Sequence, residues 1–279
     1  MKKTVGEFLG FRGIRLCMQK WKPDGDSAAA VIIMHGGVNY CDMEMYDKLA
    51  RTLADKNYAV YSFDQRGFGR SEGEIMHINS WQELRGDFAA FLRLVRTLEP
   101  EKKVFAYGLS FGACQVIDQA IVSPHLLEGI IVNSFSTLPT NIPPVAGLAI
   151  NLIGRFFPLL RLPAGSDQAL PGAKEKMKGT DLWRDPLCPA SMTVSFPKKL
   201  FTRKKEFAGQ LHFLTIPVLH QQGLDDTITL PDHSIAEKIG SRDYTYKEYP
   251  DMGHGLLDGL HTDDVINDIY IWLDERRKK

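Results

Sequence analysis

The residues most able to do chemistry lie at 108–112, where Gly-Leu-Ser-Phe-Gly places Ser110 between two glycines. This G-x-S-x-G spacing is typical of a nucleophilic serine held on a tight turn between a strand and a helix. Such a turn leaves no room for a Cβ atom two residues before or after the serine, and it strains the serine backbone so that Oγ is exposed. We expect residues 104–107 to form the strand and 113–122 the helix. The pentapeptide alone also fits an ordinary turn. Whether Ser110 is a nucleophile therefore depends on whether the chain also supplies a base, an acid and oxyanion donors.

A serine nucleophile at neutral pH needs a general base and a carboxylate that orients the base. Two loops offer these groups directly after expected strands, the first with Asp225 and Asp226 and the second with His254. Such loops meet at the carboxyl edge of an open α/β sheet, where sites form. The chain order Ser110, Asp226, His254 is the one that accompanies a serine on a strand-to-helix turn. Either aspartate could instead cap a helix or form an Asx turn, and His254 could be an ordinary loop histidine.

Negative charge that develops on the substrate oxygen needs backbone N–H donors aimed at it. One donor is expected from Phe111, the residue after Ser110, and the other from the loop that follows the strand at residues 29–34. That loop, residues 35–38, reads His-Gly-Gly-Val, and we expect Gly37 to supply the second donor. Two glycines here also permit a tight exit from the strand, which describes the same geometry.

Strands and helices alternate along most of the chain, which indicates parallel strands joined by helical crossovers. Apolar and alternating runs predict a hairpin at 7–21 and strands at 29–34, 59–63, 104–107, 129–133, 215–221 and 244–249. Helical periodicity predicts helices at 43–56, 81–98, 113–122, 231–239 and 263–273.

Residues 134–214 interrupt this alternation, since they hold nine of the 15 prolines and no clear strand. We therefore expect an α/β core, residues 1–133 and 215–279, and a helical cap insertion at 134–214. The core should contain a mostly parallel eight-stranded sheet with helices on both faces.

Composition limits the cofactors, partners and compartment that we expect. The 279 residues include 34 Lys and Arg and 34 Asp and Glu, so no global charge favours a nucleic acid partner. The cysteines are Cys17, Cys41, Cys114 and Cys188. Their wide separation indicates neither a zinc site nor a disulfide framework, but reduced thiols in a cytoplasmic protein. The basic N-terminus leads into no apolar segment, so we expect no secretory signal. We expect chemistry without a metal or a cofactor.

Together these segments resemble the α/β-hydrolase superfamily, and within it the monoacylglycerol lipase and lysophospholipase-like group, also called the hydrolase-4 or serine aminopeptidase S33 type. The matching segments span the whole core and lie at residues 35–37, 64–73, 108–112, 223–226 and 253–255. The acid loop of that family usually runs Gly-x-x-Asp, which selects Asp226 over Asp225. Its oxyanion donors map onto Gly37 and Phe111.

The resemblance also implies that residues 64–73 form a turn that shapes the sheet beside the site, so we assign them a structural role. One departure is Val38, where monoacylglycerol lipases often carry another glycine. This departure leaves the oxyanion assignment intact and weakens the inference about the substrate.

The resemblance implies that the insertion caps the site and selects the acyl substrate. The sequence agrees, because residues 142–163 are apolar almost all round, with Asn151 and Arg155 as the only polar ridge. Prolines and arginines divide this run, whereas a transmembrane span needs about 20 uninterrupted apolar residues. The run fits either a helix packed between cap and core or a hydrophobic cover over an acyl tunnel that touches a lipid surface transiently.

The insertion is also basic, with 11 Lys and Arg against 5 Asp and Glu. Four of its lysines are Lys198, Lys199, Lys204 and Lys205. They suit either an anionic membrane surface or a plain solvated surface.

These observations predict a serine hydrolase of carboxylic esters with an acyl chain, such as monoacylglycerols or lysophospholipids, that acts through an acyl-enzyme. The same groups could serve a thioesterase, an amidase or peptidase, or a hydrolase of C–C bonds. A lipid-binding module without activity is disfavoured, since such proteins usually lose a member of the triad.

Overall fold

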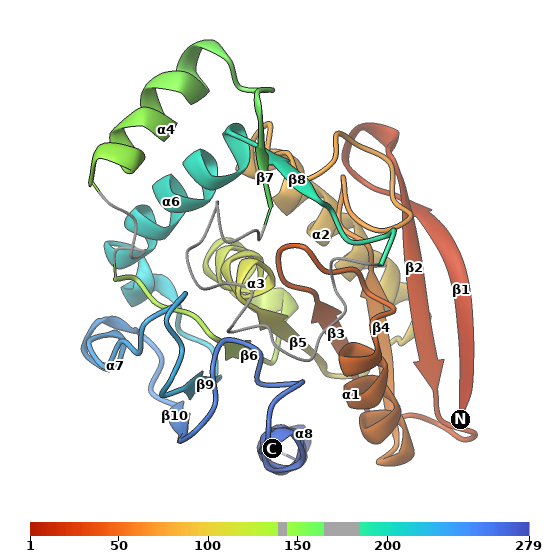
Figure 1. Ribbon diagram of the computed structural model, residues 1–279. Helices are drawn as coiled ribbons and strands as arrows, with labels where there is room; N and C mark the ends of the chain where they lie inside the picture. Colours follow the sequence, from red (N-terminus) through yellow and green to blue (C-terminus); the bar gives the residue numbers. More distant parts are fainter. Residues whose placement is uncertain (139–143, 165–184, 279) are drawn as a thin grey trace.

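The computed structural model describes residues 1–138, 144–164 and 185–278, and its centre is an eight-stranded sheet (Figure 1). The strand order is β1-β2-β4-β3-β5-β6-β9-β10. The strands are β1 (Lys2–Leu9), β2 (Arg15–Lys22), β3 (Ala29–Met34), β4 (Tyr58–Phe63), β5 (Val104–Leu109), β6 (Gly129–Asn133), β9 (Val218–Gly223) and β10 (Tyr244–Tyr249). Only the pairs that involve β2 are antiparallel, which confirms the expected mostly parallel sheet.

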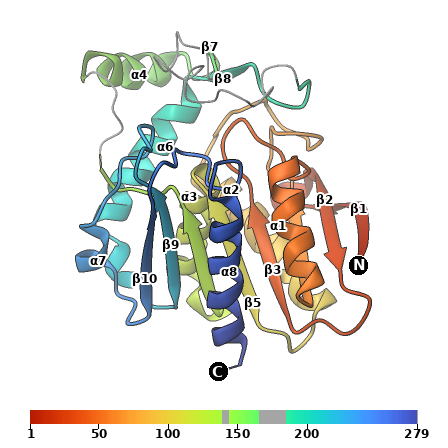
Figure 2. The same ribbon diagram turned by 60° about the horizontal axis from the view of Figure 1, so that its bottom comes forward.

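Helices cover both faces of this sheet (Figure 2). Helices α1 (Glu44–Asp55) and α8 (Thr262–Arg277) lie on one face, and α2 (Trp81–Leu98) and α3 (Phe111–Val122) lie on the other. This double cover explains why β3 is a continuous apolar run, because a parallel strand buried on both faces needs no polar positions.

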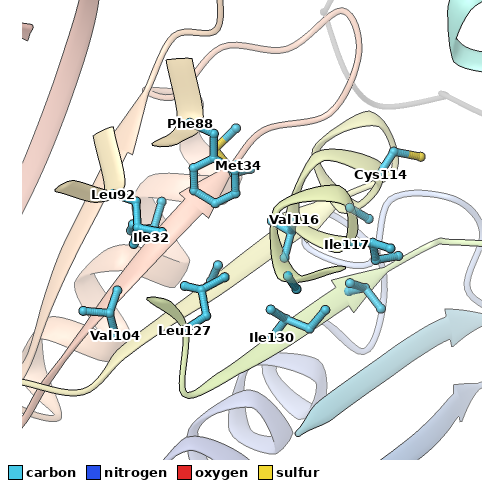
Figure 3. Close-up of a cluster of buried hydrophobic side chains, with 14 of the residues drawn as sticks. Ile32, Met34, Phe88, Leu92, Val104, Cys114, Val116, Ile117, Leu127 and Ile130 are labelled. Carbon is cyan, nitrogen blue, oxygen red and sulfur yellow. The ribbon is translucent and has the colours of Figure 1, made fainter. Parts of the chain in front are cut away.

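Two clusters of buried side chains, one on each face, hold the helices to the sheet. In the first, Ile32 and Met34 of β3 pack with Phe88 and Leu92 of α2 (Figure 3). The second joins the opposite face of the same strand to α1 and α8, with Trp272 of α8 buried inside it. Burying one such side chain contributes about 1.5–3 kcal/mol, so the two clusters together make the sheet a rigid base for the loops at its edge.

Between β6 and β9 the chain leaves the sheet and forms α4 (Pro144–Phe156), β7 (Arg161–Pro163), β8 (Ser191–Thr193) and α6 (Ser195–Ala208), all on one side of the molecule (Figures 1 and 2). Strands β7 and β8 form a small antiparallel sheet. The sequence predicted no strand here, because three residues are too few to show a period of two.

Three elements near the C-terminus differ from their predicted bounds, and one of them is α8, which continues to Arg277 beyond the predicted end at residue 273. Strand β9 begins at Val218 and not at residue 215, because Pro217 has no N–H group to donate to a neighbouring strand. Helix α7 spans only Ile235–Lys238. The segment before it stays a loop, since the buried Asp232 carboxylate accepts hydrogen bonds from the Thr137 N–H and from the Ser234 hydroxyl.

Three short 3-10 turns complete the described part of the chain, at Phe11–Gly13, Pro124–Leu126 and Leu211–Phe213. None of the described helices combines the length and the apolar character that crossing a membrane requires.

Candidate active site

Ser110 lies at the junction between β5 and α3 in a strained conformation, with φ 52° and ψ −108°. Its N–H donates to the carbonyl oxygen of Asn133 over 2.9 Å, which ties the turn to the adjacent strand β6. The turn leaves no room for a side chain at either flanking glycine. A Cβ atom on Gly108 would lie 2.6 Å from the backbone nitrogen of Ala113, and one on Gly112 would lie 2.7 Å from the carbonyl oxygen of His35. The tight turn that the sequence predicted is therefore present.

Asp226 and His254 meet beside this turn. Asp226 lies just beyond β9 and His254 beyond β10, and these strands are parallel neighbours. Asp226 Oδ2 lies 2.8 Å from Nδ1 of His254. Asp225 is exposed and makes no side-chain hydrogen bond to a described residue, so the acid next to the histidine is Asp226. This hydrogen bond orients the imidazole and leaves Nε2 for another partner.

The Asp226 carboxylate is fully charged at neutral pH despite its burial. Burial by itself raises the pKa of an aspartate, but the charge and the hydrogen bond of His254 outweigh it, and the pKa of Asp226 is lowered. The N–H groups of Ile228 and Thr229 add to this effect, since both donate to Oδ1, over 2.9 Å and 2.8 Å. The carboxylate is thus held in one orientation.

Ser134, the residue after β6, ties the histidine loop to the serine turn. Its hydroxyl donates to the carbonyl oxygen of His254 over 2.8 Å, and its side chain lines the same pocket as Ser110. Among the described residues the structure records no hydrogen bond between Ser110 Oγ and His254. Catalytic hydrogen bonds are often long without substrate and shorten in the reacting complex.

The two expected oxyanion donors have free N–H groups. Neither the Gly37 nor the Phe111 amide donates to any described residue, whereas the Gly36 N–H is occupied by the Tyr46 hydroxyl at 2.8 Å. Phe111 is the first residue of α3, where backbone N–H groups have no partner within the helix and the dipole favours negative charge. Both N–H groups therefore remain available to an incoming acceptor.

The buried imidazole of His35 fixes the loop that carries Gly37. Its Nε2 accepts from the N–H of Gln65 over 3.0 Å, and Nδ1 lies 2.8 Å from the carbonyl oxygen of Gly36. Burial lowers the pKa of His35, so the ring stays neutral with its proton on Nδ1. Val38 follows with φ 56°, a conformation that a β-branched residue adopts only under constraint.

A pocket opens beside Ser110. It is lined by Ser110, Phe111, Cys114, Ser134, Phe135, Ser136, Leu200, Phe201, Lys204, Ile228 and Thr229. Lys204 of α6 is the one charged residue among them. The sequence predicted a membrane-facing or solvated surface for this lysine, whereas it lines the pocket. The spacing of several lysines in one helix does not show which of them turns inward.

Residues 64–73 support the site without entering the pocket. The buried Asp64 carboxylate accepts from the N–H groups of Cys41 at 2.7 Å and Arg70 at 2.9 Å. Gly69 has φ 52°, and a side chain there would collide with this carboxylate. These contacts fit the structural role that the sequence suggested.

Neither a metal cluster nor a disulfide occurs in the described ranges. No group of three or more His, Cys, Asp or Glu residues there could hold an ion, and all four cysteines are buried and free.

Comparison with known proteins gives the family. Residues 25–260 match the family described as "Serine aminopeptidase, S33". The monoglyceride lipase of Rattus norvegicus is 29% identical over 272 residues, which cover 95% of this chain and 88% of that protein.

Among solved structures, the monoacylglycerol lipase of Paleococcus ferrophilus superposes with a TM-score of 0.79 at 23% identity, covering 94% of this chain and 99% of that one. A soluble variant of the Saccharomyces cerevisiae monoglyceride lipase, in complex with a substrate analog, superposes with a TM-score of 0.81 at 20% identity. This match covers 97% of this chain and 94% of that one. Since the family match extends over most of the chain and the fold is shared, the chain belongs to the serine aminopeptidase S33 family of α/β-hydrolases.

Proposed function

We propose that the chain is a serine hydrolase that cleaves carboxylic esters of acyl chains, with monoacylglycerols or lysophospholipids as substrates. The observation that carries this proposal is the 2.8 Å hydrogen bond between Asp226 and His254, at the edge of the sheet where the strained Ser110 lines a pocket. A serine, a base and an acid in this order are the groups that acyl transfer needs. The relatives are named as monoglyceride lipases, which supports an ester with an acyl chain.

In the proposed mechanism Ser110 Oγ attacks the ester carbonyl while Nε2 of His254 takes its proton. Asp226 keeps the other ring nitrogen protonated and stabilises the imidazolium. The amides of Gly37 and Phe111 bind the oxyanion of the tetrahedral intermediate. The intermediate then collapses, and His254 returns the proton to the leaving alcohol. Water attacks the acyl-enzyme in the same way and releases the acid.

We further propose that residues 134–214 form a cap on a core of residues 1–133 and 215–279. Two hydrogen bonds support a cap seated against the core, from Ser195 Oγ to the carbonyl oxygen of Ile78 at 2.6 Å and from the Trp81 indole to that of Lys199 at 3.2 Å. The ring of Phe196 lies 4.9 Å from that of Phe111, the proposed oxyanion donor. Access to the serine would therefore depend on the position of α6.

The outer face of α4 supports transient contact between the cap and a membrane surface. Val145, Leu148 and Leu152 are 79%, 70% and 60% exposed and follow one another at helical spacing. The opposite side of the helix packs on α6 through Gly154, where a Cβ atom would lie 2.9 Å from Lys198. An exposed apolar stripe on a basic cap suits insertion into the headgroup region of an anionic bilayer.

The cysteines and the net charge bear on the compartment, the partners and the cofactors of this reaction. Four free, buried thiols favour a reducing compartment, for which we propose the cytoplasm. The balanced net charge gives no overall electrostatic attraction for a nucleic acid. The proposed mechanism needs no metal or cofactor.

Labelling with a fluorophosphonate, followed by an ester panel, tests the proposal. We expect the wild type to be labelled, Ser110→Ala to lose labelling, and Ser136→Ala, which removes another pocket hydroxyl, to keep it. Persistent labelling of Ser110→Ala would refute the nucleophile assignment. A chain-length series of glycerol, nitrophenyl and CoA esters, with a matched anilide, then separates an esterase from a thioesterase or an amidase.

A further inference from the structure

The pocket beside Ser110 combines apolar walls with one cation. Its cavity volume is about 70 Å³, and its apolar lining includes Phe135, Leu200, Phe201 and Ile228. A plain alkyl chain gives an ammonium group no partner, because an ammonium group facing a hydrocarbon loses its water without replacement. The presence of Lys204 at this wall therefore needs an explanation.

Lys204 has no ion pair with a carboxylate in the described part of the chain. The acids near it have other partners. Asp226 is bound to His254 and to two backbone amides, and Asp232 accepts from Thr137 and Ser234. Burial lowers the pKa of Lys204, and the nearby Cys114, Asp226 and Asp232 oppose that effect without contacting the ammonium.

The neighbouring Arg203 shows what a satisfied cation on the same helix looks like. It is buried, and its guanidinium binds Asp118 and, over 2.7 Å, Glu206. Lys204 is half-buried, so its ammonium group has lost part of its water without gaining such a partner, and an anion that enters the site would supply the missing interaction. Carboxylates and phosphates are the groups that bind an ammonium through short charge-assisted hydrogen bonds.

We propose that Lys204 forms an anion subsite in the substrate pocket, so that the preferred ester carries a carboxylate or phosphate a short distance from the scissile carbonyl. This inference rests on the proposed ester hydrolysis and names its substrate class. Cys114, which lines the pocket with Lys204, lies in the first turn of α3, directly after Ser110. One turn of a helix is about 5.4 Å long. An extended chain covers that length in about five bonds.

Paired substrates test this subsite. In the acyl arm, ethyl monoesters of succinate, glutarate and adipate are compared with neutral ethyl alkanoates of equal length. In the alcohol arm, 1-butanoyl-glycerol 3-phosphate is compared with 1-butanoyl-glycerol. The variants are Lys204→Met and, as a matched control, Lys205→Met, which removes the same charge from an exposed position on the same helix. Thermal melting shows that each variant is folded.

We expect the wild type and Lys205→Met to prefer the charged member of at least one arm by about 10- to 100-fold in kcat/KM, the range of one charge-assisted hydrogen bond. Lys204→Met should bring that ratio close to one. The arm that responds shows whether the anion belongs to the acyl or the alcohol group. If the ratio is the same in wild type and Lys204→Met in both arms while neutral esters are cleaved, the subsite is wrong and the ester hydrolase stands.

A second measurement does not depend on ester turnover. Free glutarate should slow fluorophosphonate labelling of Ser110 in the wild type more than the neutral 1-pentanol does, and Lys204→Met should abolish this difference. Equal protection in both proteins would overturn the subsite. Protection that requires Lys204, in a protein that cleaves no ester, would support the subsite and refute the proposed reaction.

Discussion

Replacing Asp226 with asparagine tests the role of the carboxylate with almost no change in shape. Oδ1 of Asp226 accepts from the N–H groups of Ile228 and Thr229, and Oδ2 faces Nδ1 of His254 and accepts from the Gln222 side-chain amide over 3.1 Å. An asparagine keeps its oxygen on the Oδ1 side, because the reverse orientation would set its NH₂ group against two fixed backbone donors at about 1–3 kcal/mol each. The Gln222 side chain, in contrast, can turn its amide and present its oxygen. Its NH₂ group therefore points at His254.

The imidazole then has to accept a hydrogen bond at Nδ1 and carry its proton on Nε2. In that tautomer His254 cannot take the proton of Ser110. In serine proteases the equivalent aspartate-to-asparagine change lowers kcat about 10⁴-fold, or about 5.4 kcal/mol at 1.36 kcal/mol per tenfold. We expect a loss of that order in Asp226→Asn, with KM nearly unchanged because the carboxylate does not line the pocket.

The assay is kcat and KM for a nitrophenyl ester, with Asp225→Asn as the control. Asp225 is adjacent in sequence but exposed, so its amide variant should lose less than about twofold. A loss below about tenfold in Asp226→Asn, or equal losses in the two variants, would refute the orienting role that we assign to Asp226.

The same pair of proteins predicts a pH dependence of stability. The pKa of Asp226 is lowered in the folded state, so its charge contributes stability that is complete above the unfolded value of about 3.9. This contribution is lost as the pH falls through the lower folded pKa. The difference in unfolding free energy between wild type and Asp226→Asn should therefore shrink as the pH is lowered from about 6 to about 3. Urea unfolding measures it, and a difference that does not change with pH would contradict the assigned shift.

Two further predictions concern the turn and the cap. Gly112→Ala puts a Cβ atom against the backbone of Met34, so it should lower stability by about 1–3 kcal/mol and reduce activity, whereas Gly147→Ala on α4 meets open space and should leave both intact. Equal denaturant midpoints for the two variants would show that the turn tolerates a side chain. Leu152→Asp should weaken binding to anionic phospholipid vesicles at least ~10-fold by cosedimentation, since burying a leucine contributes about 1.5–3 kcal/mol, while Ile271→Asp on the distant α8 should not. Unaltered binding by the first variant would exclude α4 as the contact.

The sequence predicted the core because each of its elements leaves a local signal. Strand β3 and helix α2 have the predicted bounds, since one is a continuous apolar run and the other an apolar stripe ended by Pro100. The meeting of Asp226 with His254 could also be anticipated, because parallel strands bring their following loops to one edge. The choice of Asp226 over its neighbour came from the family spacing, and burial at hydrogen-bond distance from His254 agrees with it.

Features that depend on distant contacts could not be predicted. Strands β7 and β8 are too short for a period and exist because they pair with each other. The inward position of Lys204 depends on how α6 sits on the start of α3, and four lysines within eight residues look alike in a sequence. The positive φ of Val38 is likewise invisible, because valine is a residue that rarely adopts it.

The strained residues explain how the fold and the site depend on each other. Val38, Ser110, Ser134 and Asp251 all have positive φ, and each lies within a few residues of the carboxyl end of a sheet strand, β3, β5, β6 and β10 respectively. Strain of this kind costs about 1–3 kcal/mol per residue and persists only where the surroundings determine the conformation. Three of these strands, β3, β5 and β6, are central neighbours buried on both faces, so they supply that constraint. A cavity in either core cluster should therefore relax the serine turn and lower activity before the protein unfolds.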